Sequence, residues 1–252
     1  MHRRHGAGAA ARSAKVTRRP GGIAALHDRH ATRLLLLLLG TDAVLVALHV
    51  VYYLTPYLDA RFDLGQEGGW PECFGYLKYL TIAILFESVR RATRCHGYFA
   101  WTLVFVVLLA DDALQVHETL GRLIAGHLGI EPPFNLRRQD LGELAAAAVL
   151  GGALLVPLAW AYRRGPQRFR KVSRDMLLLV ALLVLCGVFA DAAHMVAEDR
   201  SWLAGFLGIV EDGGELVAAS LMLWYAFRLA RRRGDPGLFL LDLVLAGASD
   251  VR

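Results

Sequence analysis

Three short stretches of the chain place acidic side chains and histidines inside otherwise apolar segments. They are residues 110–118 (ADDALQVHE), 190–198 (ADAAHMVAE) and 211–215 (EDGGE). An ionisable group inside a membrane-spanning helix costs about 2.5–3.5 kcal/mol on insertion scales, so such groups are usually retained because they serve a function. Carboxylates packed together also favour proton uptake or a bound cation. The three stretches therefore predict a polar functional site within a membrane protein.

The spacing of these residues favours a metal site. Asp191 and His194 are three residues apart, so they share a helix face and can bind one ion. Single acids from other helices would complete the ligand set, as in carboxylate helical bundles that combine Glu-x-x-His pairs with lone glutamates. These ligand types suit Zn, Mn or Fe, and an oxygen-rich subset would also suit Ca or Mg. The predicted metal ligands are Asp111, His117, Glu143, Asp191, His194, Glu211 and Glu215.

The same acidic side chains also suit a path for protons or cations. The alternative relay set is Asp42, Asp112, Glu118 and Glu198. Asp42, near the middle of the first apolar run, is the inward step that a carrier needs and that an enzyme does not. His117 lies on a different helix face from Asp111, so it either faces a different neighbour or marks a bend in the helix, and whether the two share one site stays open. Three functions remain open: a metal-dependent hydrolase or redox enzyme, a proton- or cation-coupled transporter, and a structural or sensory protein.

The elements that must position these residues are apolar helices. The chain has 252 residues, of which 56% are hydrophobic, and its mean hydropathy of +0.40 excludes an ordinary soluble domain. Six apolar runs have about the 20 residues needed to cross a bilayer. They lie near 33–57, 74–91, 98–120, 141–162, 176–197 and 207–229. We predict an all-α, polytopic integral membrane bundle of six transmembrane helices.

Basic residues set the predicted orientation. Of the 28 Lys and Arg residues, 22 lie in 1–33, 90–94, 163–174, 228–233 and at position 252, all on one side of the six-helix topology. Because cytoplasmic loops carry the excess of positive charge, both termini are expected in the cytoplasm, with the chain in the inner (plasma) membrane. The net charge of +5 predicts contact with anionic lipid at that face. The sequence shows no basic fold with interleaved aromatic residues, so no nucleic-acid partner is expected.

Composition divides the chain into three parts. Residues 1–32 are expected to form a disordered, basic cytoplasmic tail, residues 33–230 the six-helix membrane domain, and residues 231–252 a cytoplasmic C-terminal tail. The loop over residues 58–73 is long enough to fold over the predicted site. The three cysteines lie on different sides of the topology, so no intrachain disulfide is expected.

The third and fourth helices look like a unit that is repeated as the fifth and sixth. The aligned pairs are Asp111 with Asp191, Glu118 with Glu198, and Glu143 with Glu215. Both units run through the bilayer in the same direction, which predicts a parallel two-helix repeat about an axis along the membrane normal. A carrier built from two such units would work as a homodimer.

Residues 111–118 (DDALQVHE) resemble the signature D-[D/E]-x-x-x-[I/V]-H-E of a group of uncharacterised bacterial multi-pass membrane proteins. Residues 66–78 are similar to the Gly-x-Pro-Glu sequence with which their second helix begins, and residues 211–215 to the paired acids of their last helix. The resemblance covers about residues 60–230. It implies a multi-pass membrane fold, and it carries no established activity, substrate or cofactor.

Overall fold

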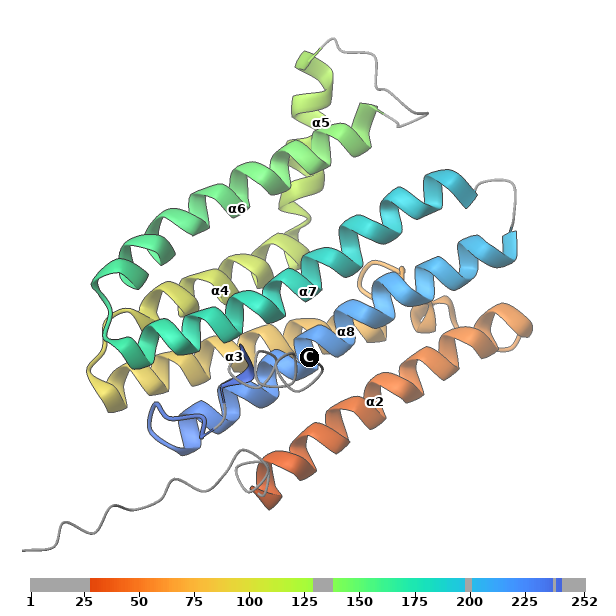
Figure 1. Ribbon diagram of the computed structural model, residues 1–252. Coiled ribbons are helices and arrows are strands. Elements are labelled where there is room, and N and C mark those ends of the chain that lie inside the picture. Colours follow the sequence, from red (N-terminus) through yellow and green to blue (C-terminus); the bar gives the residue numbers. More distant parts are fainter. Residues whose placement is uncertain (1–27, 129–137, 198–200, 238, 242–252) are drawn as a thin grey trace, which may run out of the picture.

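In the computed structural model, the chain forms a bundle of long α-helices (Figure 1). The structure describes residues 28–128, 138–197, 201–237 and 239–241; for residues 128, 138, 140, 188–197 and 201–205 it describes the backbone alone. The elements are α2 (Arg29–Leu54), the 3-10 helix η1 (Ala60–Phe62), α3 (Trp70–Thr93), α4 (Tyr98–Leu114), α5 (Val116–Leu128), α6 (Arg138–Arg164), α7 (Gln167–Ala197) and α8 (Ser201–Arg231). The described residues contain no strand, which confirms the all-helical prediction.

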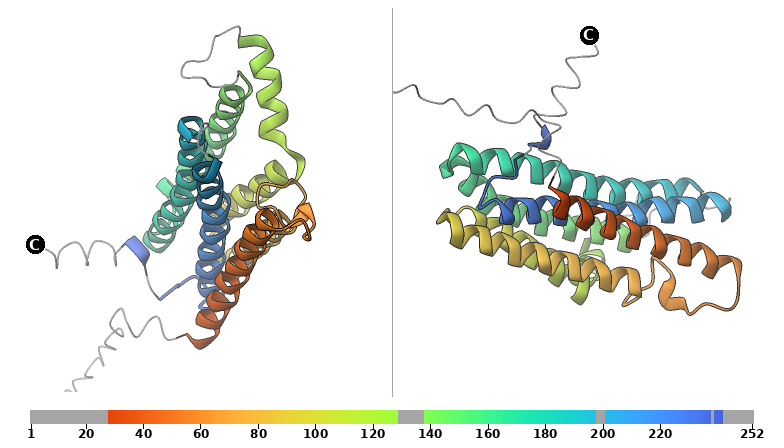
Figure 2. Two further views of the ribbon diagram at one scale, coloured as in Figure 1. Left: turned by 90° about the vertical axis from the view of Figure 1, so that its right-hand side faces the viewer. Right: turned by 90° about the horizontal axis from the view of Figure 1, so that it is seen from below.

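The long helices run between two ends of the bundle (Figures 1 and 2). At one end, Arg231 in the last turn of α8 lies 3.4 Å from Asp28, which precedes α2. Arg168, in the first turn of α7, lies 3.1 Å from Asp235 at the same end. We call this end the basic end, because the clusters at 90–94, 163–174 and 228–233 gather there. The loop between α2 and α3 lies at the opposite end.

Asp28 ties the start of α2 to the end of α8. Its carboxylate accepts hydrogen bonds from the backbone N–H groups of His30 (3.2 Å) and Ala31 (3.4 Å), as an N-cap residue does. Burial disfavours the charged carboxylate, but the Ala31 hydrogen bond and the charge of Arg231 outweigh burial and lower the pKa of Asp28. The charge at this position also interacts favourably with the dipole of α2.

The core is aromatic between α3 and α4. Phe86 of α3 stacks on Trp101 and Phe105 of α4, with ring centroids 5.9–6.0 Å apart, and aromatic pairs add to the free energy of area burial. The indole Nε1 of Trp101 donates a hydrogen bond of 3.0 Å to Ser173 Oγ, which joins α4 to α7. α8 packs against α2, α3 and α7 and is the central helix of the bundle.

Two of the described helices are long and apolar enough to cross a membrane, Arg29–Leu54 and Leu141–Arg164. Only 22% and 17% of their most apolar windows are buried inside the protein. Their outward faces carry large apolar side chains, among them Leu37, Val149 and Val156, and surfaces of this kind mark membrane or partner contact. α4 and α5 together would make a third span. The predicted six spans exceed the two or three that length and composition support.

The acidic stretch at 110–118 interrupts a helix. α4 and α5 meet at Gln115 with a bend of 69°, which corrects the prediction of one continuous span over residues 98–120. Gln115 has a φ of 50°, in the left-handed region that a residue with a Cβ rarely adopts. Beyond the bend, α5 packs on α6 at Gly121 and Gly142, where a Cβ on Gly142 would lie 2.2 Å from the Gly121 oxygen. Glycine permits this close approach.

The two halves of the predicted repeat differ in structure. α7 and α8 pack directly on each other, whereas α5 stands between α4 and α6 in the chain and packs against α6. The two-helix repeat therefore stays a prediction. Residues 28–32 of the predicted N-terminal tail are described, with 29–32 in α2, and so are residues 231–237 and 239–241 of the C-terminal tail. The rest of both tails lies outside the described residues, so the disorder of the N-terminal tail and the cytoplasmic side of both stay predictions.

Candidate functional site

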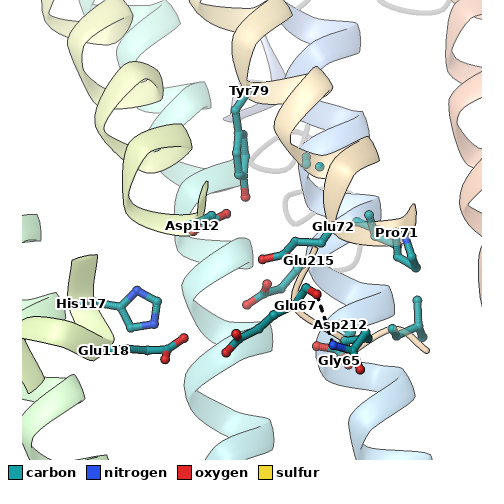
Figure 3. Close-up of a pocket in the computed structure, with 15 residues that line it drawn as sticks. Gly65, Glu67, Pro71, Glu72, Tyr79, Asp112, His117, Glu118, Asp212 and Glu215 are labelled. Carbon is teal, nitrogen blue, oxygen red and sulfur yellow. Dashed lines mark hydrogen bonds between the residues drawn. The ribbon is translucent and has the colours of Figure 1, made fainter. Parts of the chain in front are cut away.

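A cavity of about 230 Å³ opens at the end of the bundle away from the basic end (Figure 3). α3 and α8 form one wall, the junction of α4 and α5 forms another, and the loop between α2 and α3 covers it. Residues 64–67 of this loop line the cavity, so the loop, which by its length could fold over a site, lies against this one. The lining residues are Leu64, Gly65, Gln66, Glu67, Pro71, Glu72, Gly75, Tyr79, Asp112, His117, Glu118, Asp212, Glu215, Leu216 and Ala219.

The polar lining of the cavity is acidic. Its titratable members other than Tyr79 are Glu67, Glu72, Asp112, Glu118, Asp212, Glu215 and His117, and none of the described lining residues is Lys or Arg. In Figure 3 the carboxylate groups of Glu67, Glu72 and Glu215 lie in the space between α8 and the ring of His117. Carboxylates gathered in this way repel one another, so protons or a bound cation must offset their charge.

α8 contributes one continuous face to the cavity. Asp212, Glu215, Leu216 and Ala219 have the spacing i, i+3, i+4, i+7 that places side chains on one side of a helix. Glu211, which the sequence predicted as a ligand, precedes this face by one residue and does not line the cavity. The acid that accompanies Glu215 is therefore Asp212.

Asp111 stabilises the break between α4 and α5. One of its carboxylate oxygens accepts a hydrogen bond of 2.8 Å from the backbone N–H of His117, in the first turn of α5. The other lies 3.3 Å from Nδ1 of His117. Asp111 thus satisfies a free N–H at the start of α5, while the next residue, Asp112, lines the cavity. The structure places Asp111 and His117 in contact, which the sequence left open.

Side-chain hydrogen bonds connect the loop between α2 and α3 to the walls of the cavity. The amide of Gln115 donates a hydrogen bond to the carboxylate of Glu67 in the loop. The carboxylate of Glu72, in the first turn of α3, accepts from the backbone N–H of Gly68. These two contacts connect the loop to the helix break on one side and to α3 on the other.

A buried ion pair lies behind the cavity. The Nζ atom of Lys78 is 2.6 Å from a carboxylate oxygen of Asp42, and it also donates to the backbone oxygen of Leu216, a lining residue, at 2.9 Å. The second oxygen of Asp42 accepts a 2.6 Å hydrogen bond from the hydroxyl of Ser220. Asp42 and Lys78 are each 1% exposed, so the pair joins α2, α3 and α8 away from water.

The structure brings together only part of the predicted ligand and relay residues. His117, Glu215, Asp112 and Glu118 line the cavity. Glu143 lies on α6, where its carboxylate accepts a hydrogen bond of 2.8 Å from the side chain of Gln139. The side chains of Asp191 and His194 are outside the described set, as is the whole of Glu198.

Four residues of the cavity region were missing from the sequence-based site. Glu67 and Glu72 come from the loop and the start of α3, Asp212 from α8, and Lys78 from the interior of α3. The sequence contained a signal that could have identified Lys78 as part of the site. A buried carboxylate such as Asp42 needs a positive partner, and Lys78 is a cation within a predicted apolar run.

No three Asp, Glu, His or Cys side chains lie close enough to share one metal ion among the residues whose placement the structure describes. Asp191 and His194 fall outside that set, so metal binding by the full predicted ligand set stays a prediction. His117 is the described residue that most resembles a ligand. Its Nδ1 atom is buried and makes no hydrogen bond with the described residues, although a carboxylate oxygen of Asp111 lies 3.3 Å away.

Comparison with known proteins identifies a family without a known activity. No curated protein and no solved structure matches the chain. Residues 36–230, which include every helix from α3 to α7 and most of α2 and α8, match a domain of unknown function, DUF8692. This match spans most of the chain and contains the whole cavity and the buried ion pair. The chain therefore belongs to the DUF8692 family.

Proposed function

We propose that the chain is a multi-pass membrane protein that binds a cation in the acidic cavity. The observation that carries the proposal is the lining, in which six carboxylic acids and His117 surround about 230 Å³ without Lys or Arg among the described lining residues. A cation lowers the free energy of such a site because it offsets the mutual repulsion of the acids. We favour a divalent metal ion (Zn, Mn or Fe, and also Ca or Mg), because carboxylate and imidazole are its usual ligands. No three of the described side chains stand close enough to share one ion, so binding would have to draw the lining carboxylates together.

A cation carrier is the activity that we favour. Membrane carriers commonly bind their ions where a helix is interrupted and backbone groups are freed, and the break at Gln115 lies beside this cavity. Behind the cavity, Asp42 offers the further carboxylate that inward passage of a proton or cation requires. Lys78 lies 2.6 Å from that carboxylate and balances its charge.

A metal-dependent enzyme is the second candidate. The Nδ1 atom of His117 supports this candidate, because it is buried and makes no hydrogen bond with the described residues; a metal ion there would replace its 3.3 Å contact with Asp111. His117 and Glu118 would help to hold the metal ion, which would supply an activated nucleophile for hydrolysis, and a neighbouring carboxylate would act as the base. Redox chemistry would need Fe or Mn in the same position.

The orientation follows from the charge distribution. We place all six long helical segments across the inner (plasma) membrane, with the basic end in the cytoplasm. Anionic lipid head groups would then contact the basic end. The acidic cavity would open on the opposite side, where it can receive cations from outside the cell.

Binding to the purified protein tests the proposal. The protein is purified in mild detergent without chelator, its metal content is measured, and it is titrated with Zn²⁺, Mn²⁺, Ca²⁺ and Mg²⁺. We expect saturable binding that Glu215→Gln weakens about tenfold or more, the effect of losing one charged ligand. Glu211→Gln is the matched control, four residues away on α8 and outside the cavity. Absence of saturable binding, or an equal loss in both variants, would refute the proposal.

Ion uptake into proteoliposomes separates the carrier from the enzyme. The double variant Asp42→Asn/Lys78→Met removes both charges of the buried pair, so neither partner is left with an unpaired charge. A carrier that uses Asp42 loses uptake in this variant and keeps cation binding in the cavity. Unchanged uptake, or no uptake by the wild type, would exclude this route and favour the enzyme.

A further inference from the structure

His49 holds the loop that covers the acidic cavity. It lies on α2, is 6% exposed, and contacts the ring of Tyr53 edge to face with a centroid distance of 4.9 Å. Its Nδ1 atom is 3.0 Å from the backbone nitrogen of Leu64 and 3.2 Å from a carboxylate oxygen of Asp63. One ring nitrogen therefore contacts two consecutive residues of the loop.

The two contacts require opposite protonation states of that nitrogen. The backbone N–H of Leu64 can only donate, so it needs a lone pair on Nδ1. The carboxylate of Asp63 can only accept, so it needs a proton on Nδ1. A neutral ring with its proton on Nε2 bonds to Leu64, and a fully protonated ring bonds to Asp63. Proton uptake by His49 thus replaces one contact with the other.

The replacement affects the cavity through Leu64. This side chain is 5% exposed and packs against Leu45 and Leu216, and both Leu64 and residues 65–67 line the cavity. When Nδ1 is protonated, the N–H of Leu64 loses its acceptor while still buried. A buried donor without a partner is unfavourable, so this part of the loop is driven toward water.

Within the part of the chain that the structure describes, few charged groups surround the ring of His49. Asp63 of the loop contacts it, and the hydroxyl-bearing ring of Tyr53 flanks it on α2. Asp212 of α8 lies beside the same loop. Asp42 is two helical turns away on α2 and is paired with Lys78 at 2.6 Å. Asp63 is therefore the charged group best placed to stabilise protonated His49.

We infer that His49 is a proton-binding site that controls access to the acidic cavity. Neutral His49 holds residues 64–67 over the cavity, and protonated His49 releases them. The consequence for ligand binding rests on the proposed function: a cation bound in the cavity is released more readily as the pH falls. The movement of the loop itself needs no cation.

Hydrogen–deuterium exchange of the protein without added cation tests the loop movement. Exchange of a peptide covering residues 61–68 is compared at about pH 8 and about pH 5.5, the range in which imidazole titrates, after correction for the intrinsic effect of pH. We expect the corrected rate to rise about five- to tenfold at the lower pH, as for the loss of one hydrogen bond. His49→Asn keeps an acceptor near Nδ1 but takes up no proton, so its corrected rate should stay low.

A second variant tests the role of the carboxylate. Asp63→Asn keeps an acceptor oxygen but removes the negative charge that stabilises protonated His49, so the transition should move to lower pH. An equal pH response in the wild type and His49→Asn would overturn the inference, and so would a transition unaffected by Asp63→Asn.

Cation binding is measured separately with Mn²⁺ as the probe. If Mn²⁺ binds and loop exchange does not respond to pH, the inference is wrong and the proposed function stands. If Mn²⁺ and the other ions fail to bind while exchange responds in the wild type alone, the proton site stands and the proposed function is wrong.

Discussion

Lys78→Met should lower the free energy of unfolding by about 3–5 kcal/mol. Lys78 and Asp42 are each 1% exposed, and the substitution removes the 2.6 Å contact between them while keeping a side chain of similar length. Asp42 is left with the hydroxyl of Ser220 alone. Removing one partner of a buried ion pair typically costs about 3–5 kcal/mol, because the other charge stays buried.

A double-mutant cycle measures the interaction. Reversible unfolding in mixed micelles, followed by circular dichroism, is compared for the wild type, Lys78→Met, Asp42→Asn and the double variant. The double variant should be less destabilised than the sum of the two single variants by about 2 kcal/mol or more, because no unpaired charge remains. Arg91→Met, which breaks an exposed ion pair with Glu87, should cause no measurable change. Additive effects, or a cost below about 1 kcal/mol for Lys78→Met, would show that the reasoning is wrong.

Three further substitutions have expected outcomes. Gly121→Ala should destabilise the protein by about 1–3 kcal/mol, seen as a lower thermal midpoint, because its Cβ would lie 2.6 Å from Cγ of Glu143. Asp28→Asn should reduce stability at neutral pH. The folded pKa of Asp28 lies below the ordinary value of 3.8, so the difference from the wild type should shrink as the pH falls below 3.8, and a difference that persists in strong acid would contradict this. Asp175→Asn should speed hydrogen exchange at 239–241, because its carboxylate accepts two backbone hydrogen bonds from that segment; unchanged exchange would refute this anchoring role.

The long helices were predictable because apolar runs of about 20 residues indicate helices of spanning length. A bend near His117 was one of two explanations for the phase of that residue, but the break at Gln115 itself could not be located. Its positive φ is held by contacts that depend on the folded chain, namely the bond from its side chain to Glu67 and the capping of α5 by Asp111. No local sequence signal such as Gly or Pro marks the position. Helical periodicity alone could therefore not show that His117 begins a new helix.

The candidate site was predictable only in part, because periodicity shows which residues share a helix face but not which face meets the cavity. Periodicity places Glu215 on a face with either Glu211 or Asp212, at spacings of four and three residues, and the sequence does not decide between them. The choice depends on how α8 is rotated against α3, which tertiary packing sets. Glu67 and Glu72 belong to a loop and a helix start, so their approach to α8 depends on the path of the loop.

Asp42 and Lys78 are separated by 36 residues, whereas Ser220 follows Asp42 by 178. During biosynthesis, the ion pair can therefore form soon after α3 leaves the ribosome, long before α8 has been made. α2 is apolar enough to enter a bilayer by itself, and α3 is not among the described helices that meet this criterion. As a hairpin with its two charges neutralised, α3 would enter the membrane together with α2. The buried pair would then assist the membrane insertion of the nascent chain before it stabilises the folded bundle.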